Sequence, residues 1–174
     1  MEKILRRYCI YTFLDMAFSG RRERVYIKVN NNTKEARQFV ELCTGQRGSS
    51  FFNTRLTRVW NRGKAGECVF GGNYDSGVNK MLSSDGYYKK GTVMFISNTD
   101  KSGEFIIITN GKSLKFGIHI GCVWMTLKVL KKVAKLSDIT QVTVVDCGVV
   151  YFGNTTERLM YMMRKFTHPH NTLK

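Results

Sequence analysis

The stretch T-K-E-A-R-Q-F-V-E-L-C-T-G, residues 33–45, decides the fold and is the starting point for the rest of the chain. Its apolar side chains recur with the period of an α-helix: Ala36, Phe39, Val40 and Cys43. Asn32 or Thr33 can cap the start, and Gly45 follows the last apolar position, where helices commonly end in a residue with positive φ. The stretch therefore predicts a short amphipathic helix near residues 33–42, with one face on a protein core.

Strand patterns surround this helix. Runs rich in Val, Ile, Phe and Thr, bounded by turn-forming residues, occupy residues 12–18, 24–29, 92–97, 104–109 and 141–146. The run at 104–109 is apolar throughout its middle, which is typical of a strand covered on both faces. A second helical pattern spans residues 123–136, and a third spans 155–166. Many strands with separated helices predict a mainly β fold, a closed antiparallel barrel with a helix at each end.

Composition limits the kind of protein this can be. The chain has 174 residues, of which 43% are hydrophobic, and this is enough for one self-sufficient core. No apolar run approaches the roughly 20 residues of a membrane span, and the N-terminus lacks the pattern of a signal peptide. The five cysteines are widely spread and contain no C-x-x-C pair, which predicts free thiols rather than disulfides or a zinc site. We therefore expect a cytoplasmic protein without a metal or another cofactor.

Charge is the most unusual global property. With 28 basic and 13 acidic side chains, the formal net charge is +15, which implies a positive field over much of the surface. The outer face of the second predicted helix carries Lys128, Lys131, Lys132 and Lys135. This pattern is typical of a lysine-rich solvated face, and it is equally compatible with attraction to nucleic acid or to an acidic protein partner.

Five fragments, in the correct order, resemble the cyclophilins, the barrel-shaped peptidyl-prolyl cis-trans isomerases. They are T-F-L-D-M-A-F-S-G at residues 12–20, T-x-x-A-x-x-F-x-x-L-x-T-G at 33–45, L-T-R-V at 56–59, G-G-N-Y at 71–74 and V-V-D-C-G at 144–148. The resemblance covers residues 11–150. It implies a closed eight-stranded antiparallel barrel capped by two helices, with residues 151–174 forming a C-terminal helix and tail outside that domain.

The resemblance also implies a catalytic role for Arg58. The barrier to rotation about an X-Pro bond, about 18–20 kcal/mol, comes from amide resonance. A cation that donates a hydrogen bond to the prolyl nitrogen favours the twisted bond, because it holds the lone pair away from the carbonyl. The family supplies this cation from an F-H-R motif, and L-T-R at residues 56–58 matches that motif.

Most other positions of the family's site differ in this chain. The family's F-M-x-Q pocket becomes E-C-V-F at residues 67–70, so that Glu67 replaces a proline-holding ring and Phe70 replaces a backbone-binding glutamine. The family's Q-F-F-I strand becomes E-F-I-I at residues 104–107, and its loop tryptophan has no counterpart in residues 111–116. The peptide-binding positions given by the resemblance are Glu67, Cys68, Phe70, Glu104, Ile106, Leu114 and His119.

A buried carboxylate at Glu67 would need a partner, and Arg58 or Arg62 is the nearest candidate in sequence. Three hypotheses for function follow. The first is a cyclophilin-like domain that binds a proline-containing peptide or protein and has weak or absent isomerase activity. The second is an active but atypical isomerase that uses Arg58. The third is a basic protein that binds nucleic acid or an acidic partner through the lysine-rich helix and the arginines at 21–22 and 55–62.

Overall fold

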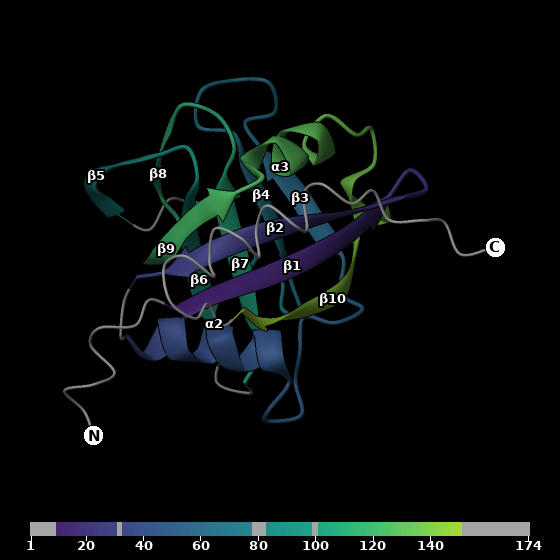
Figure 1. Ribbon diagram of the computed structural model, residues 1–174. Helices are drawn as coiled ribbons and strands as arrows, with labels where there is room; N and C mark the ends of the chain where they lie inside the picture. The colour runs from purple at the N-terminus through teal and green to yellow at the C-terminus, as the bar shows by residue number, and fades with distance from the viewer. Residues whose placement is uncertain (1–9, 31–32, 78–82, 99–100, 151–174) are drawn as a thin grey trace, which may run out of the picture.

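The structure is a computed structural model that describes residues 10–30, 33–77, 83–98 and 101–150 (Figure 1). The large sheet contains β1 (Ile10–Phe18), β2 (Arg21–Val29), β3 (Leu56–Trp60), β4 (Cys68–Gly72), β6 (Thr92–Ser97), β7 (Gly103–Ile108), β9 (Ile118–Met125) and β10 (Thr143–Val150). The small sheet pairs β5 (Ser83–Lys89) with β8 (Lys112–Lys115). The helices are α2 (Lys34–Thr44), α3 (Leu127–Val133) and the short 3-10 helix η1 (Ile139–Gln141).

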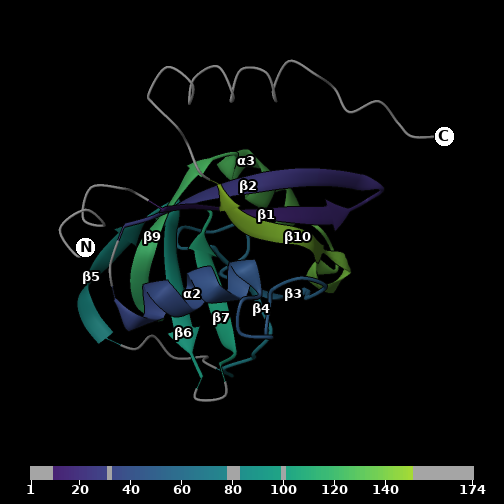
Figure 2. The same cartoon turned by 60° about the horizontal axis from the view of Figure 1, so that its bottom comes forward.

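The large sheet is antiparallel, has eight strands in the order β10-β1-β2-β9-β6-β7-β4-β3, and curls around a central core (Figure 2). Its two edges, β10 and β3, meet at an isolated bridge between Arg55 and Thr143 and do not form a ladder. Asn53, with a φ of 62°, turns the chain toward β3, so the two edges face each other over a short segment. The sheet is therefore an open, curled half-barrel in place of the closed barrel predicted from the sequence.

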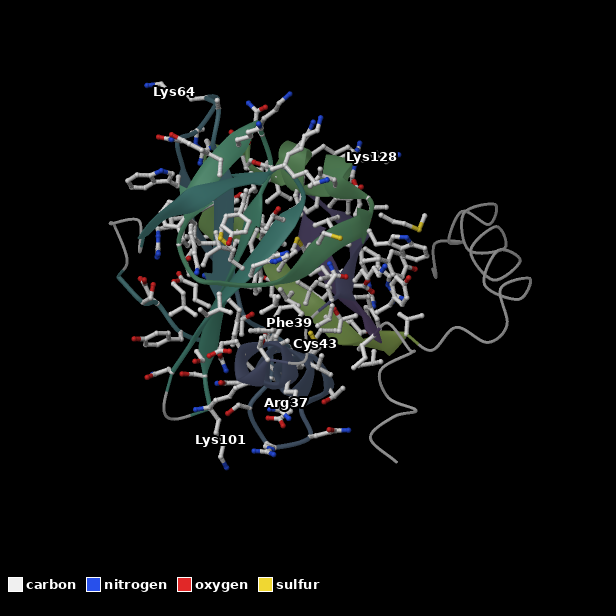
Figure 3. All side chains as sticks on the ribbon, turned by 90° about the vertical axis from the view of Figure 1, so that its left-hand side faces the viewer. Arg37, Phe39, Cys43, Lys64, Lys101 and Lys128 are labelled. Atoms are coloured by element: carbon white, nitrogen blue, oxygen red, sulfur yellow. The ribbon has the colours of Figure 1, made fainter. Side chains whose placement is uncertain are left out.

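The first predicted helix is confirmed as α2. The Thr33 hydroxyl accepts a hydrogen bond from the Ala36 N–H at 3.1 Å, and Gly45 ends the helix with a φ of 70°. Figure 3 shows Phe39 and Cys43 on the side of α2 that faces the sheet, with Arg37 on the opposite side. Because this apolar stripe packs on β10, β6, β1 and β9, α2 covers one end of the curled sheet.

The second predicted helix is shorter than the sequence pattern indicates. Residues 123–125 belong to β9, where Val123 pairs with Ile27 and Met125 pairs with Tyr26 of β2. Thr126, with a φ of 67°, separates this strand from α3. Strand pairing therefore takes precedence over the helical period in this segment. The four lysines of the pattern are exposed, as predicted, and α3 lies at the end of the sheet opposite α2 (Figure 1).

Apolar side chains cover both faces of β7, as predicted for residues 104–109. Phe105 and Ile107 join the main core inside the curled sheet, while Ile106 and Ile108 join a second cluster on the outer face. This outer cluster consists of Cys68, Phe70, Met94, Ile106, Ile108 and Phe116, with Trp60, Tyr88 and Ile96 packed against it. It lies where the family resemblance places the peptide site.

Two further sequence predictions concern the whole chain. Cys43, Cys68, Cys122 and Cys147, the cysteines in the described residues, are all free thiols, and Cys9 lies outside those residues. The predicted helix at 155–166 also lies outside the described residues. Among the helices that the structure does describe, none combines the length and the apolar character needed to cross a membrane.

Candidate functional site

The register of five neighbouring strands places four of the predicted site residues, Arg58, Phe70, Ile106 and His119, in one row. Phe70 pairs with Arg58 on one side and with Ile106 on the other, Ile106 pairs with Met94, and Met94 pairs with His119. Neighbouring strands lie about 4.8 Å apart, so the two ends of this row are separated by about 19 Å along the sheet. Arg58 and His119 therefore lie at opposite ends of this row.

His119 has local partners at its end of the row. Its Nε2 atom lies 3.0 Å from the Gly121 carbonyl oxygen, and its ring packs 5.6 Å from the Tyr88 ring. These contacts are typical of a structural histidine on a partly buried strand. His119 thus lies at the opposite end of the row from Arg58, and its predicted peptide-binding role stays a prediction.

Arg58 is held on three sides. Its Nη1 atom lies 2.8 Å from Asp75 Oδ1 and 3.0 Å from Glu104 Oε1, and its Nη2 donates to Glu104 Oε2 at 3.3 Å. The guanidinium carbon lies 4.1 Å from the centre of the Phe70 ring, a cation–π contact. The predicted catalytic cation is thus fixed between two carboxylates and an aromatic ring.

The two carboxylates that face Arg58 differ in their surroundings. Glu104 is fully buried and accepts hydrogen bonds from the Ser76 hydroxyl and, at 3.3 Å, from the Ser76 N–H. Burial raises the pKa of Glu104, and the contacts with Ser76 and Arg58 oppose this rise without cancelling it. Asp75 is largely exposed, and hydrogen bonds from the Gly77 N–H and from Arg58 lower its pKa.

The predicted pairing of Glu67 with an arginine is wrong. Its carboxylate accepts hydrogen bonds from the Gly63 N–H at 2.7 Å and from the Thr109 hydroxyl at 2.6 Å. Because successive side chains of an extended chain point to opposite faces, Glu67 lies on the other face from Cys68 and Phe70. Glu67 therefore does not contact Arg58, although the two residues are close in sequence.

Arg62, the other candidate partner of Glu67, also binds elsewhere. Its Nη1 donates to the carbonyl oxygens of Ala134, the C-cap of α3, at 2.7 Å, and of Leu136, which lies beyond the helix. Neither arginine considered in the sequence analysis therefore balances the Glu67 charge, which the Gly63 and Thr109 donors solvate instead.

Aromatic rings fill the outer cluster beside Arg58. The Phe70 and Phe116 rings meet edge to face at 5.4 Å, Trp60 lies 5.7 Å from Phe116, and both phenylalanines are fully buried. Cys68 lies in the same cluster, and burial raises the pKa of its thiol to about 11, so that it is protonated at neutral pH. Leu114 lies on β8, and its side chain is outside the description.

Sequence reasoning missed Asp75, Ser76 and Phe116. Asp75 and Ser76 directly follow the G-G-N-Y turn, so their place in a polar loop after a strand was an available signal. Phe116 carried no such signal, because β8 and the neighbouring β9 bring it to the outer cluster from a distant part of the chain.

Comparisons with known proteins identify the fold. No protein-family model matches the sequence, and no curated protein matches it. The crystal structure of the Mimivirus cyclophilin is similar, with a TM-score of 0.59 and 15% sequence identity over 83% of this chain and 91% of that chain. A cyclophilin-type peptidyl-prolyl cis-trans isomerase from Cryptosporidium parvum gives a TM-score of 0.49 and 13% identity over 84% and 100% of the two chains. The similarity to the Mimivirus cyclophilin structure shows that the chain has the cyclophilin fold, which confirms the resemblance found in its sequence.

Proposed function

We propose that this chain is a diverged cyclophilin-like domain that binds a proline-containing peptide or protein and has weak or absent isomerase activity. One observation carries the proposal. The guanidinium of Arg58 is bound by Asp75 and Glu104, so it faces two anions where an isomerase needs it to face a prolyl nitrogen.

The two carboxylates oppose catalysis in two ways. They occupy Nη1 and Nη2 of Arg58, so a substrate nitrogen would have to compete for the same donors. They also offset the positive charge that would stabilise the twisted X-Pro bond. Displacing the buried Glu104 is costly, because a buried charge that loses its partner is strongly destabilising.

The partner surface that we propose is the rim of the outer cluster beside Arg58. Trp60 lies two residues beyond Arg58 on the same face of β3 and is only partly buried. Exposed aromatic rings bind proline-rich segments without requiring any bond rotation. Trp60 and the exposed Asp75 therefore supply an apolar and a polar contact for a bound peptide.

The active, atypical isomerase is the competing proposal, and one observation favours it. The Asp75 side chain is 65% exposed, and ion pairs of exposed carboxylates contribute only about 0.2–1 kcal/mol. A peptide could displace Asp75 at small cost and reach Nη1 while Glu104 continues to hold Nη2.

A proline-isomerisation assay with matched arginine variants separates these two functions. Wild type, Arg58→Ala and Arg55→Ala are compared with an X-Pro tetrapeptide, Arg55 being an exposed arginine three residues away. We expect all three proteins to leave the exchange rate close to that of the free peptide. Turnover by wild type and Arg55→Ala that is lost in Arg58→Ala would establish the active isomerase instead.

Peptide binding is measured separately by amide chemical shifts of the labelled protein during titration with a proline-rich peptide. We expect the largest changes in β3 near Trp60 and a loss of binding in Trp60→Ala. An absence of both binding and turnover would contradict the proposed function.

A further inference from the structure

A hollow lies apart from Arg58, between the β3–β4 loop, the segment after β7 and α3. Its volume is about 510 Å³, within the range of sites for small molecules. The charged and polar residues that line it are Arg62, Glu67, Thr109, Asn110, Lys131 and Lys135. In Figure 1 this region lies at the top of the molecule, where α3 sits beside the loop that follows β3.

Arg62 is a fixed cation in the wall of this hollow. Its Nη1 donates to the carbonyl oxygens of Ala134, the C-cap of α3, and of Leu136, which lies beyond the helix. The carbonyl of a helix C-cap such as Ala134 lacks a partner within the helix and carries partial negative charge. Arg62 therefore holds the β3–β4 loop against α3 and offsets the negative end of the helix, which would otherwise repel an anion.

Glu67 is the one carboxylate in the lining, and its oxygens are already used. Oε2 accepts from the Gly63 N–H, and Oε1 accepts from the Thr109 hydroxyl. Glu67 forms no ion pair with a lysine within the described residues. This carboxylate therefore holds the loop next to Arg62 and does not neutralise Lys131 or Lys135.

Lys131 lies on α3, Lys135 lies two residues beyond its last residue Val133, and both line the hollow. Neither ammonium group forms an ion pair with a described residue. Lys132, on another face of the same helix, pairs with Glu23 at 3.0 Å. The three cations and one carboxylate of the lining leave the hollow with a net charge of +2.

We propose that this hollow binds the phosphate group of a small phosphate monoester. A phosphate monoester is close to a dianion at neutral pH, which matches the charge of the lining, and its oxygens accept hydrogen bonds from lysine and arginine. A carboxylate ligand would balance only half of the charge. The site is distinct from the Arg58 rim and does not depend on the function proposed for it.

A single-stranded nucleic acid fits this surface less well than a small ligand does. A strand needs a continuous cationic track. Lys132 of α3 is paired with Glu23, and Arg22 of β2 is bound by Asp15 and Asp146, so neither of these cations is free to continue such a track.

Amide chemical shifts of the labelled full chain test the proposal during titration with glycerol 3-phosphate at constant ionic strength. Glycerol is the uncharged matched compound, and inorganic phosphate tests recognition of the phosphate group alone. We expect shifts at Gly63, Asn110 and Lys135 with a dissociation constant of about 1 mM or tighter. We expect no response to glycerol, and binding of inorganic phosphate supports recognition of the phosphate group itself.

Matched lysine variants localise the site. Lys131→Ala and Lys135→Ala should each weaken binding about fivefold or more, since each removes one charged donor, and Lys132→Ala should change it less than twofold. Glu67→Gln should tighten binding, because it removes the negative charge and retains an acceptor oxygen. The dispersion of the amide spectrum shows whether each variant is folded.

Three outcomes would overturn this proposal. The first is an absence of shifts up to about 10 mM ligand, which is weaker than any specific site of this kind. The second is equal weakening by Lys132→Ala and Lys131→Ala, which indicates a diffuse positive field. The third is oligothymidylate binding that Lys132→Ala reduces as much as Lys131→Ala does, which indicates a nucleic-acid surface.

Discussion

The Nη1 atom of Arg58 lies 3.0 Å from the Oε1 atom of Glu104, whose side chain has no exposed surface. Oε1 is an ion-pair partner without an aligned hydrogen bond, while Oε2 receives the hydrogen bonds of Ser76 and of Arg58 Nη2. The same arginine reaches the exposed Asp75. One cation is thus shared between a buried carboxylate and an exposed carboxylate, and a substrate would have to compete with both for the guanidinium.

Releasing Arg58 should raise isomerase activity. Asp75→Asn removes one carboxylate from Nη1, and Phe70→Gln replaces the ring beneath the guanidinium with the amide found in the cyclophilins. We expect the double variant to accelerate X-Pro exchange above the wild-type rate in a protease-coupled assay. Glu35→Gln on α2 is the charge-matched control and should leave the rate unchanged. A folded double variant that stays at the uncatalysed rate would show that more than Arg58 sequestration prevents catalysis.

Glu104 should make stability depend on pH. Burial raises its folded pKa above the ordinary value of 4.5, so the folded protein binds a proton that the unfolded chain releases. The stability that comes from this proton binding is present below pH 4.5 and is lost as the pH rises through the folded pKa. Wild type therefore loses unfolding free energy as the pH rises above 4.5, and Glu104→Gln does not. We expect the difference in unfolding free energy between the two proteins, measured by urea unfolding, to shift in favour of Glu104→Gln as the pH rises toward 7. A difference that is constant with pH would contradict the raised pKa.

Asp15 should show the opposite dependence on pH. Burial raises its pKa, but the hydrogen bonds from Arg24 and Arg22 outweigh this effect and hold it below 3.8. The contribution of Asp15 to the free energy of unfolding is therefore present above pH 3.8 and is lost as the pH falls through the folded pKa. Asp15→Asn should cost about 1–3 kcal/mol of unfolding free energy at pH 7.

The control for Asp15 is Asp146→Asn. Asp146 binds the same Arg22 but is 47% exposed, so its loss should cost only about 0.2–1 kcal/mol. Equal costs for the two variants at pH 7, or an Asp15→Asn cost that persists at pH 2, would contradict this assignment.

Thr33 should stabilise α2 through its side chain. Its hydroxyl accepts from the Ala36 N–H, so Thr33→Ala should cost about 1 kcal/mol in urea unfolding. Thr33→Ser keeps the hydroxyl and should stay close to wild type. A similar loss in both variants would mean that the methyl group, rather than the cap, stabilises the helix.

Cyclosporin-type ligands should bind with little or no affinity. Recognition in the cyclophilins uses a loop tryptophan and an open pocket lined by rings, whereas this chain has no tryptophan in residues 111–116 and fills the outer cluster with Phe70 and Phe116. Losing one buried aromatic contact costs about 3–5 kcal/mol, or several decades of affinity. Sub-micromolar binding in calorimetry would contradict the alignment of Phe70 and Ile106 with the family's pocket.

Local patterns predicted the elements more reliably than the contacts between them. The helix at α2 follows from its apolar spacing and from the caps at Thr33 and Gly45, all of which act within a few residues. The same reasoning extended α3 too far toward its start, because residues 123–125 gain more from pairing with β2 than from a helical turn. A local period gives no information about such a partner strand.

The spacing of apolar residues, the helix caps and the turn residues by themselves determined the mainly β class, the helix α2 and the exposed lysines of the second helical pattern, because their physical effects are local. The cyclophilin fold was implied by the resemblance of five fragments to that family. The tertiary structure alone decided that Arg58 binds Asp75 and Glu104, that Glu67 faces Thr109, and that the curled sheet stays open. Each of these depends on the register and curvature of strands far apart in the chain. A shift of one residue in register moves a side chain to the opposite face.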